Sequence, residues 1–176
     1  LAIVWGTPER RRGAIDAALA RSRANRTKIA VVSEAAGRRA VTRYEVLATY
    51  PKGEAKPVAS LLRLTLETGR THQVRVHLAH IGHPLLGDMT YGAGFKASAR
   101  KLGEEAQAAL ATLGRQALHA AELAFVHPVT GKRLQFASLP MTQGGYILLG
   151  LPCVALVLPI ARRIHLPTRQ FVLALT

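Results

Sequence analysis

Residues 63–92 read RLTLETGRTHQVRVHLAHIGHPLLGDMTYG and contain the strongest structural signals of the chain. Leucines alternate with polar residues up to position 66, which is the period of a half-buried strand. Gly69 can adopt a positive φ, so the chain can turn sharply after this strand. Thr71 can then cap a following helix. The stretch therefore predicts a strand, a turn and a helix in direct succession.

The predicted helix has an apolar side and a defined end. Val74, Leu78 and Ile81 recur at helical spacing. Gly82 follows in the position typical of a helix C-terminus, and Pro84 prevents the helix from resuming.

Polar side chains surround this strand–turn–helix. Cationic groups and hydrogen-bond donors near a helix N-terminus favour an anionic ligand, and the helix dipole adds to the attraction. Any single one of them could instead belong to a solvated face, but eight within twenty-one positions indicate a binding surface: Arg63, Arg70, His72, Gln73, Arg75, His77, His80 and His83.

Composition indicates a basic protein with a core. The 176 residues carry a formal net charge of +14, and 49% of them are hydrophobic. This predicts a folded domain whose partner is a polyanion, either nucleic acid or an anionic membrane surface. Cys153 is the only cysteine, which excludes a disulfide framework and a cysteine-based zinc site within this sequence and fits a reducing cytoplasm.

Strands are more frequent than helices in the rest of the pattern. We expect strands at 1–5, 29–32, 41–50, 61–66, 118–126 and 133–137. The runs 29–32 and 41–50 read as a hairpin, residues 16–23 show helical spacing, and 99–113 reads as a helix. These elements predict an α+β fold with an antiparallel or mixed sheet flanked by helices.

The two ends of the sequence differ from the middle. Leu1 begins inside an expected strand, so the chain looks N-terminally truncated. From residue 141 onward the sequence is atypical, and residues 146–161 are almost wholly apolar but contain Pro152 and Pro159. A spanning helix needs about 18 residues. We expect a domain at 1–140 and a tail at 141–176 that arose by frameshift or read-through, with a membrane-associating segment as the alternative.

Several motifs resemble the RluA family of pseudouridine synthases. The central match is TGRTHQVRVHLAHIGHPLLGDMTYG at 68–92, followed by RQALHA at 115–120 and FVHPVTG at 125–131. Upstream, LAIVWG at 1–6 and AVTRY at 40–44 also fit. The similarity runs in order from residue 1 to about residue 140.

This resemblance implies a pseudouridine synthase fold with a cleft across a mixed sheet. It implies isomerisation of uridine to pseudouridine in ribosomal or transfer RNA, by a cytoplasmic and monomeric enzyme without a metal or organic cofactor. The family's catalytic aspartate lies in a His-Arg-Leu-Asp-x-x-Thr-Ser-Gly motif, which these 176 residues lack. The family's tyrosine would precede Leu1. Asp16 and Asp88 have other neighbours, so we expect this polypeptide alone to be inactive.

The resemblance also assigns roles near the turn. Arg70 matches the basic residue that pairs with the catalytic aspartate, with a phosphate contact as the alternative. Leu66 matches the apolar wall of the uracil pocket, with a core leucine as the alternative. We expect contact with RNA from Thr71, His72, Gln73, Arg75 and His77, although His77 could equally be a buried, hydrogen-bonded histidine.

Two other functions stay open at this point. The chain could be a basic RNA-binding module without catalysis, or a remnant that attaches to membranes through residues 146–161. A metal site is not expected, because no acidic residue accompanies His77 and His80 on the predicted helix.

Overall fold

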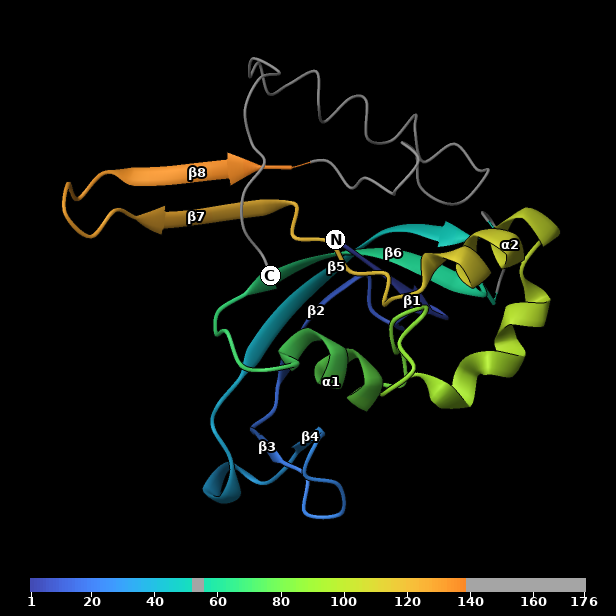
Figure 1. The fold of residues 1–176 in the computed structure, drawn as a ribbon, viewed down its shortest axis with the longest axis horizontal. Helices are drawn as coiled ribbons and strands as arrows, with labels where there is room; N and C mark the ends of the chain where they lie inside the picture. The colour runs from blue at the N-terminus through green and yellow to red at the C-terminus, as the bar shows by residue number, and fades with distance from the viewer. Residues whose placement is uncertain (52–55, 139–176) are drawn as a thin grey trace.

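The computed structural model describes residues 1–51 and 56–138, and Figure 1 shows their fold. The central sheet has the strand order β1-β6-β5-β2, and each neighbouring pair is antiparallel. Its strands are β1 (Ala2–Trp5), β2 (Arg12–Asp16), β5 (Val41–Tyr50) and β6 (Ala59–Leu66).

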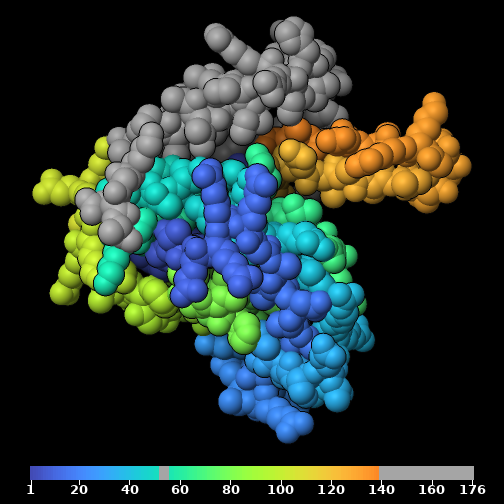
Figure 2. Space-filling model, turned by 180° about the vertical axis from the view of Figure 1, so that it is seen from behind, coloured from blue at the N-terminus to red at the C-terminus, as the bar shows by residue number. Residues whose placement is uncertain are grey.

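Two hairpins extend from this sheet. The first, which we call the arm, consists of β3 (Leu19–Arg21) and β4 (Ile29–Val31). The second consists of β7 (Glu122–Val126) and β8 (Arg133–Ala137) and stands clear of the body in Figures 1 and 2. Every residue of β7 is exposed.

Each helical segment lies between two strands in the sequence. A 3-10 turn, η1 (Glu34–Ala36), follows the arm, and α1 (Gln73–His80) follows β6. A second 3-10 segment, η2 (Ala93–Lys101), leads into α2 (Glu104–Leu113). The described fold is therefore α+β with antiparallel sheets.

The main core lies between the sheet and α1. Val4, Leu62 and Leu78 have no exposed surface and belong to one apolar cluster. Burying a side chain of this size stabilises the fold by about 1.5–3 kcal/mol. Leu78 thus fixes α1 against the strand that precedes it, which also fixes the turn between them.

Two smaller clusters attach the remaining elements. One joins Trp5 of β1 to Leu102, with apolar residues of α2 packed against it. The other joins Leu19, Ala40 and Val76, and so places the arm against α1.

The prediction for residues 63–92 is confirmed in its main features. The strand predicted at 61–66 lies within β6, and a helix follows after the turn. The helix ends at His80, and Gly82 adopts a φ of +82°, a conformation that glycine tolerates best. Thr71 as helix cap is wrong, because His72 occupies the N-cap position and makes no side-chain capping hydrogen bond.

Two other predictions are wrong. Residues 29–32 and 41–50 do not form a hairpin, because β4 pairs with β3 while β5 pairs with β2 and β6. Residues 16–23 contain the end of β2 and all of β3 instead of a helical segment. Ile15 and Leu19 are both buried, but in different clusters. Their spacing of four reflects two separate strands, not one helix face.

The expectations for 99–113 and 118–126 hold in part. The first range is divided between the end of η2 and α2, and Gly103 stands between them as the N-cap of α2. The strand expected from residue 118 begins at Glu122.

The expected tail at 141–176, including the apolar run 146–161, lies outside the described residues. Within the described ranges, no helix combines the length and apolar character needed to cross a membrane.

Candidate functional site

The turn between β6 and α1 is fixed to β5 by a buried side-chain amide. Gln73 is 3% exposed, and its Oε1 accepts hydrogen bonds from the N–H of Arg70 (2.9 Å) and the hydroxyl of Thr68 (2.8 Å). Thr68 Oγ1 in turn accepts the N–H of Val41 at 2.9 Å. Because each of these groups has a defined partner, the backbone that carries Arg70 is held in one place.

The same amide continues into a chain of hydrogen bonds inside the protein. Gln73 Nε2 donates to the carbonyl of Val41 (2.9 Å) and to Thr42 Oγ1 (3.0 Å). Thr42 Oγ1 lies 2.9 Å from Nδ1 of His77, whose Nε2 lies 3.0 Å from the carbonyl of Ala17. A carbonyl only accepts, so His77 carries its proton on Nε2. Its Nδ1 accepts a hydrogen bond from the hydroxyl of Thr42. Buried polar groups linked in this way rigidify a site.

This arrangement changes the interpretation of Gln73 and His77. We expected both side chains to contact RNA, but His77 has no exposed surface and Gln73 almost none. Their polar atoms are already occupied by protein partners. Gln73 and His77 therefore support the turn from inside, which for His77 was the alternative left open by the sequence.

We predict that the neutral state of His77 makes the fold sensitive to acid. Burial lowers the pKa of His77 below its ordinary value, and this outweighs the opposing effect of the Ala17 carbonyl. The unfolded chain therefore takes up a proton at higher pH than the folded chain does. The free energy of unfolding should fall as the pH drops below about 6.5, by at most about 1.4 kcal/mol per pH unit for this histidine.

Denaturant unfolding between pH 7 and pH 5 measures this effect. The variant His77→Gln should unfold more easily at pH 7 but depend less on pH than the wild type does. A free energy of unfolding that is as pH-dependent in the variant as in the wild type would assign the effect to other groups.

The outward side of the turn carries the remaining candidate residues. Arg70 and Thr71 are exposed, and Leu66 at the end of β6 is 50% exposed. This exposure excludes the core leucine that was the alternative for Leu66. Arg70 Nε donates to the carbonyl of Arg39 at 3.4 Å, and among the described residues no carboxylate lies within ion-pair distance of its guanidinium.

Arg75 has a different position from the one expected of an RNA contact. Its Nε and Nη2 donate to the two carboxylate oxygens of Asp88 at 2.7 and 2.8 Å, and its side chain is only 15% exposed. The guanidinium also lies 5.0 Å from the ring centre of Tyr91. Arg75 is therefore a structural residue that holds the loop after α1, and the prediction that it contacts RNA is wrong.

Asp88 is the acceptor at the centre of that loop. Burial raises the pKa of its carboxyl, but the hydrogen bonds from Arg75 and from the N–H groups of Tyr91 and Thr90 outweigh burial and lower the pKa below its ordinary value. Asp88 is thus held ionised. No pattern in the sequence indicates the pairing of Arg75 with Asp88, because the partners are thirteen residues apart and follow no local spacing.

His72 links the turn to the same loop. It has a φ of +55°, in the left-handed region that residues other than glycine adopt rarely, and its side chain is half-buried. Its Nδ1 lies 2.9 Å from the hydroxyl of Tyr91. The structure thus brings Leu66, Arg70, Thr71 and His72 to one turn, whereas Gln73, Arg75 and His77 face inward.

Other arginines on the sheet are engaged by carboxylates. Arg12 and Arg63 both contact Glu45, and Arg43 contacts Glu67. Within the described part of the chain, no three or more His, Cys, Asp or Glu residues come close enough to hold a metal ion.

Known proteins resemble this chain in sequence and in fold. A family model described as RNA pseudouridylate synthase matches residues 1–80. The ribosomal large subunit pseudouridine synthase D of Zymomonas mobilis is 49% identical over 140 residues, which is 79% of this chain and 40% of that protein. The ribosomal large subunit pseudouridine synthase D of Haemophilus influenzae is 44% identical over 129 residues, which is 73% of this chain and 37% of that protein.

Solved structures add a similarity of fold. The human RNA Pseudouridylate Synthase Domain Containing 4 superposes with a TM-score of 0.53 at 26% identity, covering 79% of this chain and 56% of that one. The chain spans about 40% of the length of the curated relatives that it matches. The long ordered motif at 68–92 and these matches agree, and the chain belongs to the RluA family of pseudouridine synthases.

Proposed function

We propose that residues 1 to about 140 form the RNA-binding and carboxylate-orienting part of an RNA pseudouridine synthase catalytic domain. The proposed reaction detaches uracil from its ribose and reattaches it through C5, in structured RNA and without a metal or organic cofactor. The proposed enzyme is a cytoplasmic monomer, and ribosomal RNA is the first substrate to test because the relatives' names specify the ribosomal large subunit.

The observation that carries this proposal is that Arg70 has a fixed backbone and an exposed guanidinium. Its backbone is held by the buried amide of Gln73, while its guanidinium is exposed and has no carboxylate partner among the described residues. Its Nε donates to the carbonyl of Arg39, and its two terminal nitrogens have no partner among the described residues, so they are suited to grip a carboxylate in two parallel hydrogen bonds. The catalytic aspartate of the family is such a group.

The neighbours of Arg70 support the same role. Leu66, the last residue of β6, is 50% exposed, whereas the first two residues of that strand are buried. An exposed apolar side chain four residues before an exposed guanidinium offers an apolar surface for a base and a charge for the reacting group. Asp16 and Asp88 do not supply the carboxylate, since Arg39 and Arg75 engage them.

The proposal can be tested by transplanting the segment. We expect the 176-residue polypeptide to form no pseudouridine, because its sequence lacks the aspartate motif. In a chimaera, the part of this chain that matches the Zymomonas mobilis relative would replace the corresponding segment of that protein. This chimaera should convert uridine in large-subunit ribosomal RNA, measured by nucleoside analysis after digestion.

Two results would contradict the proposal. One is conversion of uridine by the isolated polypeptide, which would require a nucleophile that we have not recognised. The other is a folded chimaera that binds the RNA but leaves its uridines unchanged. That second result would favour the alternative function, a basic RNA-binding module without catalysis. The net charge of +14 is the observation that supports this alternative.

A further inference from the structure

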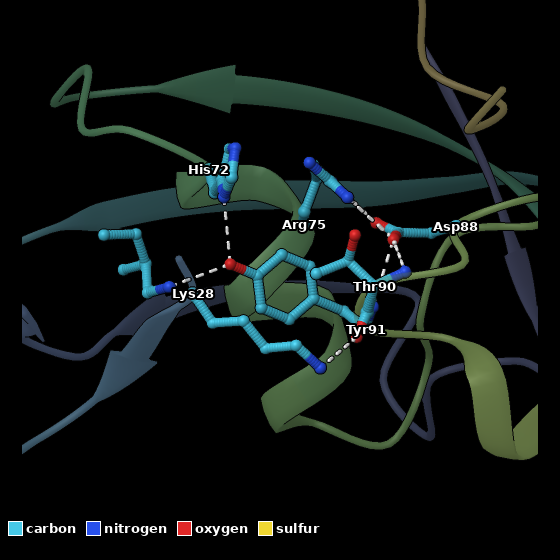
Figure 3. A network of polar contacts seen from close by, with 7 residues as sticks. Lys28, His72, Arg75, Asp88, Thr90 and Tyr91 are labelled. Carbon is cyan, nitrogen blue, oxygen red and sulfur yellow. Dashed lines mark hydrogen bonds and ion pairs between the residues drawn. The ribbon is translucent and has the colours of Figure 1, made fainter. Parts of the chain in front are cut away.

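The hydroxyl of Tyr91 joins three segments that are distant in sequence (Figure 3). It accepts the N–H of Ile29, at the start of β4, at 2.9 Å. It also lies 2.9 Å from Nδ1 of His72, just before α1, with the two rings edge to face. Close by, Lys28 Nζ donates to the carbonyl of Thr90 at 3.0 Å. The arm, the helix start and the loop after α1 therefore meet at this phenol.

The proton positions at this junction follow from the partners. A backbone N–H can only donate, so Tyr91 accepts from Ile29 and keeps its own hydroxyl proton for another acceptor. Across the described ranges, His72 Nδ1 is the acceptor found within reach of that hydroxyl. When the Tyr91 hydroxyl donates to Nδ1, Nδ1 is unprotonated and neutral His72 carries its proton on Nε2.

The surroundings of His72 favour the same neutral state. Burial and the charge of Arg75 lower the pKa of His72, while Asp88 acts in the opposite direction. A protonated Nδ1 would also compete with the hydroxyl proton of Tyr91. His72 is therefore neutral at pH 7.

The Nε2–H of His72 is left as a free donor. In residues 1–51 and 56–138 it has no hydrogen-bond partner, and His72 follows the exposed residues Arg70 and Thr71 on the same turn. The left-handed backbone at His72 costs free energy, and such strain persists where the surroundings hold it in place. Here Tyr91 holds the ring.

We propose that Tyr91 is a positioning residue, which fixes His72 as a neutral Nε2–H donor to an oxygen of the RNA beside Arg70. This inference rests on the proposed function, since it takes RNA as the ligand. It adds a specific donor, the proton that this donor carries, and a link from the donor to the arm. The RNA oxygen can belong to a phosphate or to a base, because both accept from an N–H.

The first test is the tautomer of His72 in the full 176-residue chain. Nitrogen-15 spectra of the imidazole distinguish protonation at Nε2 from protonation at Nδ1. We expect Nε2–H in the wild type, and a mixture of the two tautomers in Tyr91→Phe. Phenylalanine keeps the ring against Arg75, so only the hydroxyl is lost. An Nδ1–H tautomer in the wild type would overturn the inference.

The second test is affinity for a large-subunit ribosomal RNA fragment. Tyr91→Phe should weaken binding about threefold to tenfold, which corresponds to one hydrogen bond. His72→Gln keeps an amide N–H near the position of Nε2 and should retain more affinity than His72→Ala. A neutral donor releases no counterion, so the dependence of affinity on salt should not change in these variants.

The matched control is Tyr44→Phe, which removes a phenol hydroxyl from another half-buried tyrosine, on β5. Its RNA affinity and the His72 tautomer should equal those of the wild type. If the wild type binds RNA but Tyr91→Phe and His72→Ala bind equally well, the inference is overturned and the proposed function stands. If the wild type binds no RNA while showing the Nε2–H tautomer, the proposed function fails and the donor role with it.

Discussion

Replacing Arg70 by lysine in the active chimaera is expected to slow the single-turnover rate by about a hundredfold, a typical cost of misplacing a reacting group. Affinity for the RNA should stay within about threefold, because lysine keeps the positive charge. Lysine offers a point charge, so it cannot hold the two oxygens of an aspartate in a fixed plane. The loss should therefore fall on the reacting carboxylate and not on RNA binding.

Arg70→Ala should have a larger effect and change the pH dependence. Without the guanidinium, the carboxylate that it faces loses its counter-charge, and the pKa of that carboxylate rises. The acidic limb of the pH–rate profile should then move to higher pH. Arg100→Lys, an exposed arginine of η2, is the control and should leave both rate and affinity unchanged. Equal losses of rate and affinity in the Arg70 variants would reduce Arg70 to a phosphate contact.

Removing the carboxylate of Asp88 is expected to destabilise the fold by about 3–5 kcal/mol, the usual cost of leaving one partner of a buried ion pair. The Asp88 side chain has no exposed surface, and Arg75 donates to both of its oxygens. Asp88→Ala also leaves the N–H groups of Thr90 and Tyr91 without their acceptor. Since domains are stable by only about 5–15 kcal/mol, this loss is large.

Urea unfolding followed by the fluorescence of Trp5 measures this loss. Trp5 is the single tryptophan and is 4% exposed, so it reports on the core. The matched control is Asp16→Ala, which breaks an exposed ion pair with Arg39 and should cost about 1 kcal/mol or less. Similar losses in the two aspartate variants would mean that the Arg75–Asp88 pair contributes no more than a surface pair.

The periodic elements of the fold could be predicted from the sequence. The alternation of leucines gave β6, and the apolar spacing with Gly82 gave α1 and its end. Both signals are local, because each depends on residues a few positions apart. The pairing of β4 with β3 was not predicted, because strand pairing does not depend on local spacing. Strand length and composition do not say which neighbour a strand will choose.

The candidate site was predictable at the level of the turn but not of each side chain. Gln73 and His77 look like surface donors in the sequence, yet both bond to Thr42, which lies 31 and 35 residues earlier. Arg75 looks like a phosphate contact until Asp88 is placed beside it. A polar residue on a helix faces inward when a distant segment offers it partners, and helical spacing contains no information about that segment.

β1 receives hydrogen bonds from parts of the chain that are made much later. Besides its ladder with β6, the carbonyl of Ile3 accepts the N–H of Leu86, and the N–H of Ile3 donates to Ala117. The N–H of His119 donates to the carbonyl of Leu1 at 2.9 Å. During synthesis on the ribosome, β1 can pair with β6 first, but its other edge cannot complete its hydrogen bonds until the segment around residue 117 has emerged. Such long-range pairing slows folding, so the unpaired edge of this strand stays open to pairing with other chains for longer.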